Sequence, residues 1–358
     1  MLYPKNLSPG ATIGICAPSS GVQADQLVRL DNAIKNVRAL GYEVIETPSL
    51  RKNKKCVSAD AQTRASEFMS LWEDPAVAAI LPPWGGEFLM DMLPRLDWDK
   101  LAALPPKWLC GYSDTSTLCF ALATRLDIAT LHGSNLMNMG FREIDPHDLR
   151  AFEAMSCDAF TQESATHYGT FRDWSDIAGP VYALEQPSIW QALEANPPGS
   201  SPWEELSPRA TEEGFAERRV SFEGRILGGC MDTLCKLLGT EYAPVTGFLQ
   251  NYPGEHFIWT LESCEMNAGD IYRSLWQMRQ AGWFERCAGI LIGRPDGCGD
   301  THDFTLDDAL RLAFEGMGVP ILTGCDIGHI PPQLQLVNGA FARVEYADGR
   351  ATIHQEKR

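Results

Sequence analysis

The chain has 358 residues, of which 44% are hydrophobic and 22% charged, and this composition excludes disordered, collagenous and coiled-coil classes in favour of a globular protein of about two domains. It carries 30 Lys and Arg against 47 Asp and Glu, a net charge of −17. An acidic surface argues against binding of a nucleic acid polymer or an anionic membrane. No apolar run approaches the roughly 20 residues that span a bilayer, and the start does not resemble a signal peptide.

Eleven cysteines are scattered along the chain, several of them inside apolar runs, and no two form a Cys-x-x-Cys pair. This usage is typical of reduced, buried thiols in a cytoplasmic protein. It predicts no structural zinc site.

In the first part of the chain, short apolar runs alternate with stretches of helical spacing. The predicted strands cover 12–17, 42–48, 76–83 and 107–112, and the predicted helices cover 25–40, 59–73, 87–96 and 115–126. This alternation predicts an α/β fold, in which crossover helices connect the strands of a parallel sheet. Ligands of such sheets bind beyond the carboxyl ends of the strands.

The segment 165–222 differs from its surroundings, because prolines and tryptophans crowd it and its periodicity is weak. It is either a connector or a functional segment, and both interpretations stay open. Beyond it the regular pattern returns. The predicted elements are a helix over 230–240, a strand over 256–263, a helix over 268–282, a strand over 287–293, a helix over 305–318, a strand and turn over 319–329 and a hairpin over 339–355.

Ser113 lies between the strand KWLCGY and the helix that begins at Thr115. A serine at a tight strand-to-helix turn has its hydroxyl exposed, and the amide of the next residue, Asp114, can donate a hydrogen bond to an oxyanion. The full Gly-x-Ser-x-Gly pattern is absent, so Ser113 or Asp114 can equally be a simple helix cap.

Gly85 and Gly86 form a second turn of interest, after the strand AVAAILPP. Backbone without a Cβ allows a substrate to approach closely at Gly85, and the Gly86 amide can be the second oxyanion donor. The alternative is a plain strand-to-helix turn. The chain has no Gly-rich phosphate loop, no His-Glu-x-x-His motif and no dinucleotide fingerprint.

A serine nucleophile needs a base, usually a histidine, and an acidic group that orients it. His132 and His329 both follow apolar strands and occupy turns, so either one is a candidate. Glu262 ends the apolar strand HFIWTL, where a carboxylate rarely lies without a partner. A helix cap or an ion pair with Arg273 is the structural alternative for Glu262.

Seven short segments spread over nearly the whole chain carry a further signal. They are IGICAPSSG, PPWGGEFLMDMLPRLDW, GYSD, GRILGGCMDTLCKLLGT, WTLESCE, IYRSLWQMRQAGWFERCAGILIGR and GHIPPQLQLVNGA. In number and order they resemble the LD-carboxypeptidase family of serine peptidases, which also contains the microcin C immunity protein. The chain departs from the family pattern at Cys230 and Met231, where Asn-Leu is usual.

The resemblance implies a catalytic triad of Ser113, Glu262 and His329. It also implies an active site in the cleft between two domains and a homodimer. Because the triad and the amides near Gly86 and Asp114 suffice for acyl transfer, we expect no metal or organic cofactor to be required. The implied parts are an N-terminal Rossmann-like domain at 1–165 with the nucleophile, a connector or lid at 166–222, and a smaller C-terminal α/β domain at 223–358 with Glu and His.

Two substrate classes compete within this family. LD-carboxypeptidases release the terminal D-Ala of murein tetrapeptides, whereas immunity-type members cleave an amide that joins an aminoacyl group to a nucleotide. Trp203 is the best match to a tryptophan that stacks on the nucleobase, and we expect Trp190 or Trp203 near the leaving group. Arg225 and Arg294 are both candidates for binding a substrate carboxylate.

Two functions of other classes are alternatives to a hydrolase. A non-catalytic ligand-binding module on the same scaffold would tolerate loss of a triad residue, but all three are present. A nucleotide-dependent ligase or kinase would need a Gly/Lys loop around the phosphates, which the sequence lacks.

Overall fold

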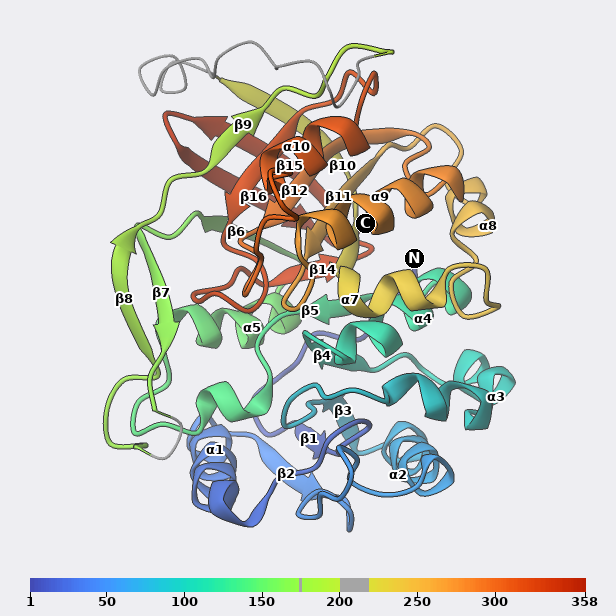
Figure 1. The fold of residues 1–358 in the computed structure, drawn as a ribbon. Helices are drawn as coiled ribbons and strands as arrows, with labels where there is room; N and C mark the ends of the chain where they lie inside the picture. The colour runs from blue at the N-terminus through green and yellow to red at the C-terminus, as the bar shows by residue number, and fades with distance from the viewer. Residues whose placement is uncertain (174–175, 200–218) are drawn as a thin grey trace.

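The computed structural model describes residues 1–173, 176–199 and 219–358, and its two main sheets confirm the predicted α/β fold (Figure 1). The first sheet has the order β14-β5-β4-β3-β1-β2, and all its strands are parallel except β14. Its strands are β1 (Thr12–Ile15), β2 (Glu43–Glu46), β3 (Val77–Ile80), β4 (Trp108–Gly111), β5 (Thr130–His132) and β14 (Leu336–Asn338). Its helices are α1 (Leu27–Ala39), α2 (Ala61–Glu73), α3 (Trp98–Ala103), α4 (Thr115–Leu126) and α5 (Pro146–Ser156).

The second sheet is mixed, with the order β6-β16-β15-β10-β11-β12-β13-β9. Its four central neighbours β10 to β13 are parallel and its outer strands are antiparallel. The strands are β6 (Ala159–Glu163), β9 (Gln191–Leu193), β10 (Val220–Cys230), β11 (Phe257–Glu262), β12 (Cys287–Gly293), β13 (Ile321–Cys325), β15 (Phe341–Ala347) and β16 (Arg350–Glu356). The helices are α7 (Met231–Leu234), α8 (Val245–Gln250), α9 (Ala268–Gln280) and α10 (Leu306–Ala313).

The two sheets exchange strands across the chain. β14 comes from the C-terminal half but pairs with β5 of the first sheet, and β6 precedes the connector but pairs with β16 of the second. The Asn338 side chain, on β14, also bonds the backbone N–H and C=O of Gly228 on β10, at 2.9 and 3.3 Å. A boundary drawn at a single residue therefore cannot separate the two sheets.

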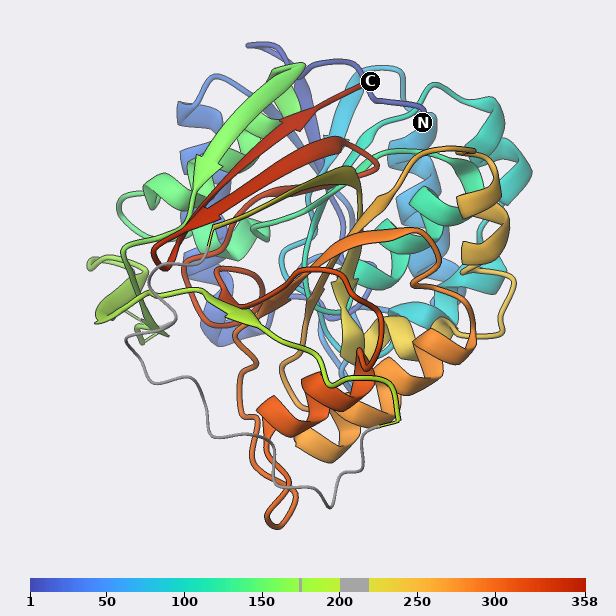
Figure 2. The same ribbon diagram turned by 90° about the horizontal axis from the view of Figure 1, so that it is seen from above.

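Helix α4 joins the two halves through a shared hydrophobic core. Its residues 115–124 are all buried, because the helix lies between the first sheet and elements of the second half (Figures 1 and 2). Phe120 stacks on Trp283 at 5.1 Å between ring centroids and lies 6.3 Å from Trp259. The helix that follows Ser113 is thus held rigidly from both sides.

Several local predictions need correction. The segment 87–96 is a 3₁₀ helix at Leu89–Arg95 rather than an α-helix, as Pro94 has no N–H with which to continue an α-helical ladder. The helix expected over 230–240 is only α7 followed by a short 3₁₀ turn. The segment 165–222 is more regular than its composition suggests, since it contributes β9 and the hairpin of β7 (His167–Phe171) and β8 (Tyr182–Pro187).

The two chain ends lie side by side in both ribbon views (Figures 1 and 2). The Tyr3 hydroxyl donates to the main-chain oxygen of Arg358 at 3.0 Å. Within the three described ranges, no helix combines the length and the apolarity that a bilayer crossing requires.

Candidate active site

Ser113 occupies a strained turn between β4 and α4. Its φ is +63°, in the left-handed region that costs a non-glycine residue about 1–3 kcal/mol. The turn lies directly against Gly85, where an added Cβ would come within 2.7 Å of the Ser113 Cβ and 2.8 Å of its Oγ. Only glycine therefore fits at position 85. Ser113 is a strained serine at the carboxyl end of a parallel strand, which is the geometry of a nucleophile turn.

The Asp114 side chain holds this turn in place through hydrogen bonds. It is buried, and its carboxylate accepts hydrogen bonds from the Ser19 hydroxyl at 2.5 Å and the Leu89 backbone N–H at 2.9 Å. Burial raises the pKa of this carboxyl despite those bonds. Asp114 does not cap α4 with its side chain, so its role is to tie together three separate segments around Ser113.

Two backbone amides near Ser113 are free to bind an oxyanion. Among the residues that the structure describes, neither the Gly86 N–H nor the Asp114 N–H has a hydrogen-bond partner. Gly86 has a φ of +145°, and a Cβ there would collide with the hydroxyls of Ser19 and Ser20. The glycine is therefore required by its backbone conformation and by its close neighbours.

The buried Glu262 and the partly buried His329 form a pair at the end of β11. The Nδ1 atom of His329 lies 2.9 Å from Oε2 of Glu262, which is the contact that we expected between them. Glu262 is fully buried, and the turn of His329 comes so close that a Cβ on Gly328 would lie 2.6 Å from Oε2. Position 328 requires glycine, because a Cβ would collide with Glu262 and because the φ of +99° is in the left-handed region.

Each residue of this pair stabilises the charged form of the other, and both pKa values shift accordingly. Burial by itself lowers the pKa of His329, but the Glu262 carboxylate and Cys264 together outweigh burial and hold that pKa well above its usual value. Burial raises the pKa of Glu262, and the neighbouring His329 overcomes this effect so that the net pKa is lowered. Such a pair keeps Glu262 ionised and the imidazole basic, as a general base requires.

The ring of His329 meets that of Tyr112 edge to face, with centroids 5.0 Å apart. Since Tyr112 directly precedes Ser113, this contact places the Glu262–His329 pair next to the turn that holds Ser113. No hydrogen bond joins Ser113 to His329 within the described residues. Catalytic hydrogen bonds of unliganded sites often tighten only when substrate binds.

His132, the alternative base, contacts a different serine. Its Nδ1 atom is 3.3 Å from the hydroxyl of Ser116, the second residue of α4, and burial lowers its pKa to about 4. It is 1% exposed, whereas the side chain of His329 is 18% exposed. This environment suits a neutral, structural histidine.

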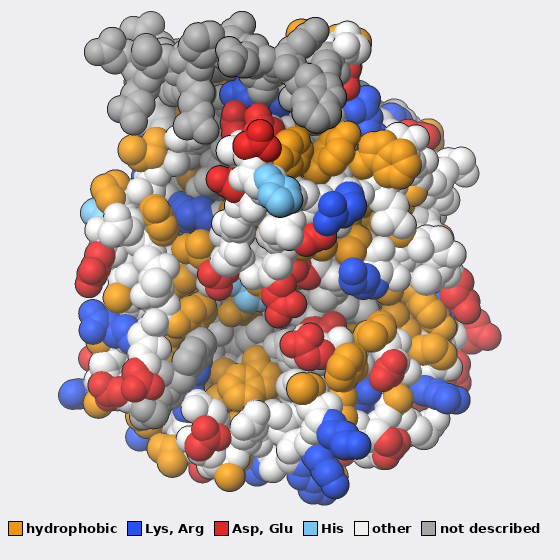
Figure 3. All heavy atoms as spheres, viewed as in Figure 1, with side chains coloured by type: hydrophobic (Ala, Val, Ile, Leu, Met, Phe, Trp, Pro, Cys, Tyr) orange, Lys and Arg blue, Asp and Glu red, His pale blue; other side chains and the backbone are white. Residues whose placement is uncertain are grey.

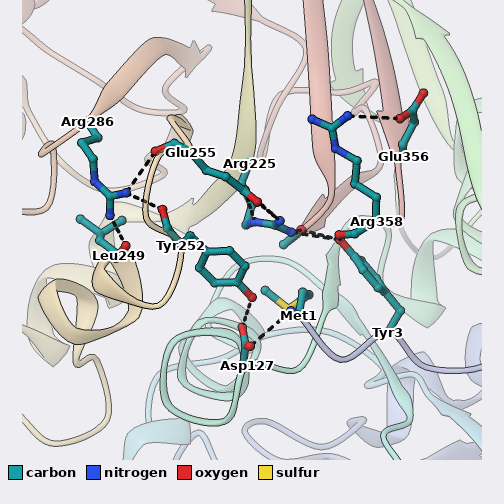
Figure 4. Close-up of polar contacts among 11 residues, drawn as sticks. Met1, Tyr3, Asp127, Arg225, Leu249, Tyr252, Glu255, Arg286, Glu356 and Arg358 are labelled. Atoms are coloured by element: carbon teal, nitrogen blue, oxygen red, sulfur yellow. Dashed lines mark hydrogen bonds and ion pairs between the residues drawn. The ribbon is translucent and has the colours of Figure 1, made fainter.

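Arg225 is occupied by a polar network that Figure 4 shows near the chain ends. Its guanidinium makes two bonds to Glu255, at 2.8 and 2.9 Å, and lies over the ring of Tyr252 at 4.2 Å. It also bonds the Tyr3 hydroxyl at 3.1 Å, while Tyr252 bonds Asp127. Arg225 thus links the N-terminal segment to the second half and is not free to bind a substrate carboxylate.

Trp190 is also committed to the structure. It is completely buried, and its indole N–H donates to Asp326 at 3.0 Å. Arg294 pairs with the same carboxylate and with the Ser188 hydroxyl, under the ring of Tyr168. The expectation that Trp190 contacts the substrate is corrected here, because its side chain has no exposed surface and anchors the connector to the core. Trp203 lies outside the described residues.

A cavity of about 1050 Å³ opens beyond the carboxyl ends of β12 and β13. The connector forms one wall, and Ile330, the neighbour of His329, forms part of another. Among its lining residues are Tyr168, Ile189, Leu193, Arg294 and Ile330. Figure 3 shows the face viewed in Figure 1, which is hollowed in its middle and has Asp and Glu side chains around the hollow.

Two groups that the sequence did not single out lie near the Glu262–His329 pair. Cys264 contributes to the raised pKa of His329, and the carboxylate of Asp232 accepts the backbone N–H of Cys264 at 3.1 Å. No sequence motif predicts these two residues, because they come together only through the pairing of β10 with β11.

Comparison with known proteins identifies the family. The profile of the LD-carboxypeptidase N-terminal domain matches residues 13–133, and that of the LD-carboxypeptidase C-terminal domain matches residues 223–344. A Vibrio cholerae protein named "Putative carboxypeptidase" is 27% identical over 97% of this chain and 96% of its own length. The Escherichia coli protein named "Microcin C7 self-immunity protein MccF" is 23% identical over 98% of this chain and 95% of its own.

Solved structures share the fold over the whole chain. An MccF-like protein from Bacillus anthracis superposes with a TM-score of 0.80 at 20% identity, covering 100% of both chains. A muramoyltetrapeptide carboxypeptidase from Oxalobacter formigenes gives a TM-score of 0.69 at 18% identity, covering 97% of this chain and 99% of its own. With both domain profiles matched in order and the complete fold shared, the chain belongs to the LD-carboxypeptidase family, peptidase family S66.

Proposed function

We propose that the protein is a serine hydrolase that cleaves an amide bond near the C-terminus of a small peptide, with Ser113 as nucleophile, His329 as base and Glu262 as its orienting partner. The observation that carries this proposal is the pair of His329 with the buried Glu262, in contact through Tyr112 with the strained Ser113 turn. A purely structural ion pair would not need a left-handed serine beside it.

The chemistry follows from these positions. Ser113 Oγ attacks the carbonyl carbon and passes its proton to Nε2 of His329, while Glu262 holds Nδ1–H and stabilises the imidazolium. His329 then gives the proton to the leaving amine, and the amide C–N bond breaks. A water molecule, deprotonated by the same imidazole, hydrolyses the acyl-serine and releases the acid.

The amides of Gly86 and Asp114 would bind the oxyanion of the tetrahedral intermediate. Both N–H groups lack a partner in the described residues, and Gly85 keeps the two turns in contact. Loss of one such donor typically costs about 10²- to 10³-fold in kcat. The proposed chemistry therefore proceeds with the chain's own groups.

For the substrate we propose a murein tetrapeptide, from which the enzyme releases the terminal D-Ala. This assignment is supported by the family and by relatives such as the Bacillus subtilis "Probable murein peptide carboxypeptidase", 24% identical over 98% of this chain. An aminoacyl-nucleotide amide is the second candidate. It is favoured by the cavity of about 1050 Å³ beside the His329 turn, which is far larger than D-Ala needs, and by one similar structure, an MccF complex with aspartyl sulfamoyl adenosine.

One experiment tests both assignments. The purified protein is incubated with a murein tetrapeptide and, separately, with an aminoacyl sulfamoyl adenosine, and the products are identified by mass spectrometry. We expect loss of D-Ala from the first, and loss of turnover by several orders of magnitude in Ser113→Ala. A folded Ser113→Ala protein with near-wild-type activity would refute the mechanism, and turnover of the nucleotide alone would reverse the substrate choice.

We further propose that the enzyme acts as a cytoplasmic homodimer. The cytoplasmic placement is supported by the eleven cysteines, all of which are free thiols. Sedimentation equilibrium of the full chain measures the oligomeric state directly, and a monomer would contradict the dimer.

A further inference from the structure

Three metal-binding side chains converge beside the catalytic pair. The Sγ atoms of Cys230 and Cys264 and a carboxylate oxygen of Asp232 all lie within 4.8 Å of one another. Cys230 ends β10, Asp232 is in the first turn of α7, and Cys264 follows β11 by two residues. The parallel register sets Cys230 opposite Glu262, so the ends of two adjacent strands bring the three groups together.

The carboxylate of this cluster is already fixed in place. Oδ2 of Asp232 accepts the backbone N–H of Cys264 at 3.1 Å, and Oδ1 accepts that of Glu265 at 3.0 Å. The Cys230 thiol points at Oδ2 from 3.5 Å. When the Cys230 thiol loses its proton, a lone pair on Oδ2 becomes available, so the carboxylate can bind a cation while it keeps both backbone hydrogen bonds.

We propose that Cys230, Asp232 and Cys264 form a binding site for a thiophilic divalent cation such as Zn²⁺, and that its occupation inhibits the hydrolase. Two thiolates and one carboxylate are ligands that zinc takes readily, at about 2.3 Å for sulfur and 2.0–2.2 Å for oxygen. Around a tetrahedral ion these lengths put ligand atoms about 3.5–3.8 Å apart, so side-chain rotations of modest size close the present cluster. The thiol protons that the cation replaces leave to solvent.

The inhibitory part rests on the proposed function. Cys264 follows Glu262 by two residues, Cys230 lies opposite Glu262 in the sheet, and Glu262 bonds Nδ1 of His329. A cation held by the cluster therefore lies near the imidazole that must accept the proton of Ser113. Three protein ligands leave the fourth position of a tetrahedral ion open, and an imidazole nitrogen is a ligand that zinc takes there. Either the positive charge or direct ligation would withdraw the base from catalysis.

Cobalt substitution tests the site without relying on activity. The reduced, metal-free full-length protein is titrated with Co²⁺, and thiolate-to-cobalt charge-transfer absorption is followed. We expect one Co²⁺ per chain, displaced by Zn²⁺, with an affinity reduced at least about 10- to 100-fold in Cys264→Ser and in Asp232→Asn. Cys56→Ser, which changes an exposed thiol outside the cluster, is the matched control and should titrate like the wild type.

Activity is then measured with and without Zn²⁺ in the same variants. We expect Zn²⁺ to inhibit the wild type and Cys56→Ser, and to inhibit Cys264→Ser at least tenfold more weakly relative to the variant's own metal-free rate. No thiolate absorption, or absorption that Cys264→Ser leaves unchanged, overturns the site. Cobalt binding without zinc inhibition overturns the inhibitory role alone. An inactive wild type refutes the proposed function, while the cobalt titration still decides the site.

Discussion

Replacing Glu262 by Gln removes the negative charge 2.9 Å from Nδ1 of His329 and leaves a side chain of nearly the same shape. In the wild type, the raised pKa of His329 means that the base is protonated, and inactive, until the pH exceeds that value. The kcat/KM of the wild type should therefore rise with pH, with a limb above the ordinary histidine value of 6.5. The substitution should move this limb to lower pH.

The direction of the shift follows from the contact. Two unit charges about 4 Å apart attract each other by about 4 kcal/mol at an effective dielectric constant of about 20, so the carboxylate strongly favours the protonated imidazole. Without the carboxylate, burial lowers the pKa of His329 and only Cys264 still opposes it, so the pKa must fall.

The assay is a profile of kcat/KM from about pH 5 to about pH 10, which reports the base of the free enzyme. In Glu262→Gln we expect a limb at lower pH and a plateau reduced by about 10³- to 10⁴-fold, because the amide no longer stabilises the imidazolium. Glu255→Gln makes the same change at a carboxylate paired with Arg225, and its limb should stay in place. A limb of Glu262→Gln that stays in place or moves to higher pH would refute the assigned pair.

Three further changes test other parts of the structure. Gly85→Ala puts a Cβ 2.7 Å from that of Ser113, so the nucleophile must shift, and kcat should fall about 10²-fold while circular dichroism is unchanged; wild-type kcat would show that the turn yields freely. Asn338→Ala breaks two buried bonds to Gly228 and should lower the free energy of unfolding by about 1–3 kcal/mol in urea titrations, unless water replaces the amide. Trp190→Ala should cost about 3–5 kcal/mol of stability and reduce turnover of both substrates equally; a selective loss on the nucleotide would restore its role as a substrate contact.

The sequence was most informative where local signals agree with the fold. The strand of residues 107–112 and the helix starting at Thr115 correspond closely to β4 and α4, because a buried apolar run and a long helical run leave few alternatives. The unusual position of Ser113 follows from these two neighbours. An isolated carboxylate at the end of an apolar strand was likewise enough to single out Glu262.

Other features depend on contacts between distant segments. The choice between His132 and His329 could not be made from the residues alone, since both follow apolar strands; only the resemblance to a family separated them. β14 has three residues, too few to show a period, and its strand conformation comes from pairing with β5. The Cys230–Cys264 cluster spans 34 positions of sequence and depends on strand register, which no local motif encodes.

The exchanged strand β14 has a mechanical consequence. It begins seven residues after His329, is hydrogen-bonded to β5, and β5 in turn pairs with β4, whose end leads to Ser113. Asn338 on the same strand fastens it to β10 of the other sheet. A hinge motion that separated the two halves would have to break these hydrogen bonds, so β14 resists a displacement of Ser113 from His329. The alignment of the proposed nucleophile and base is therefore built into the strand pairing.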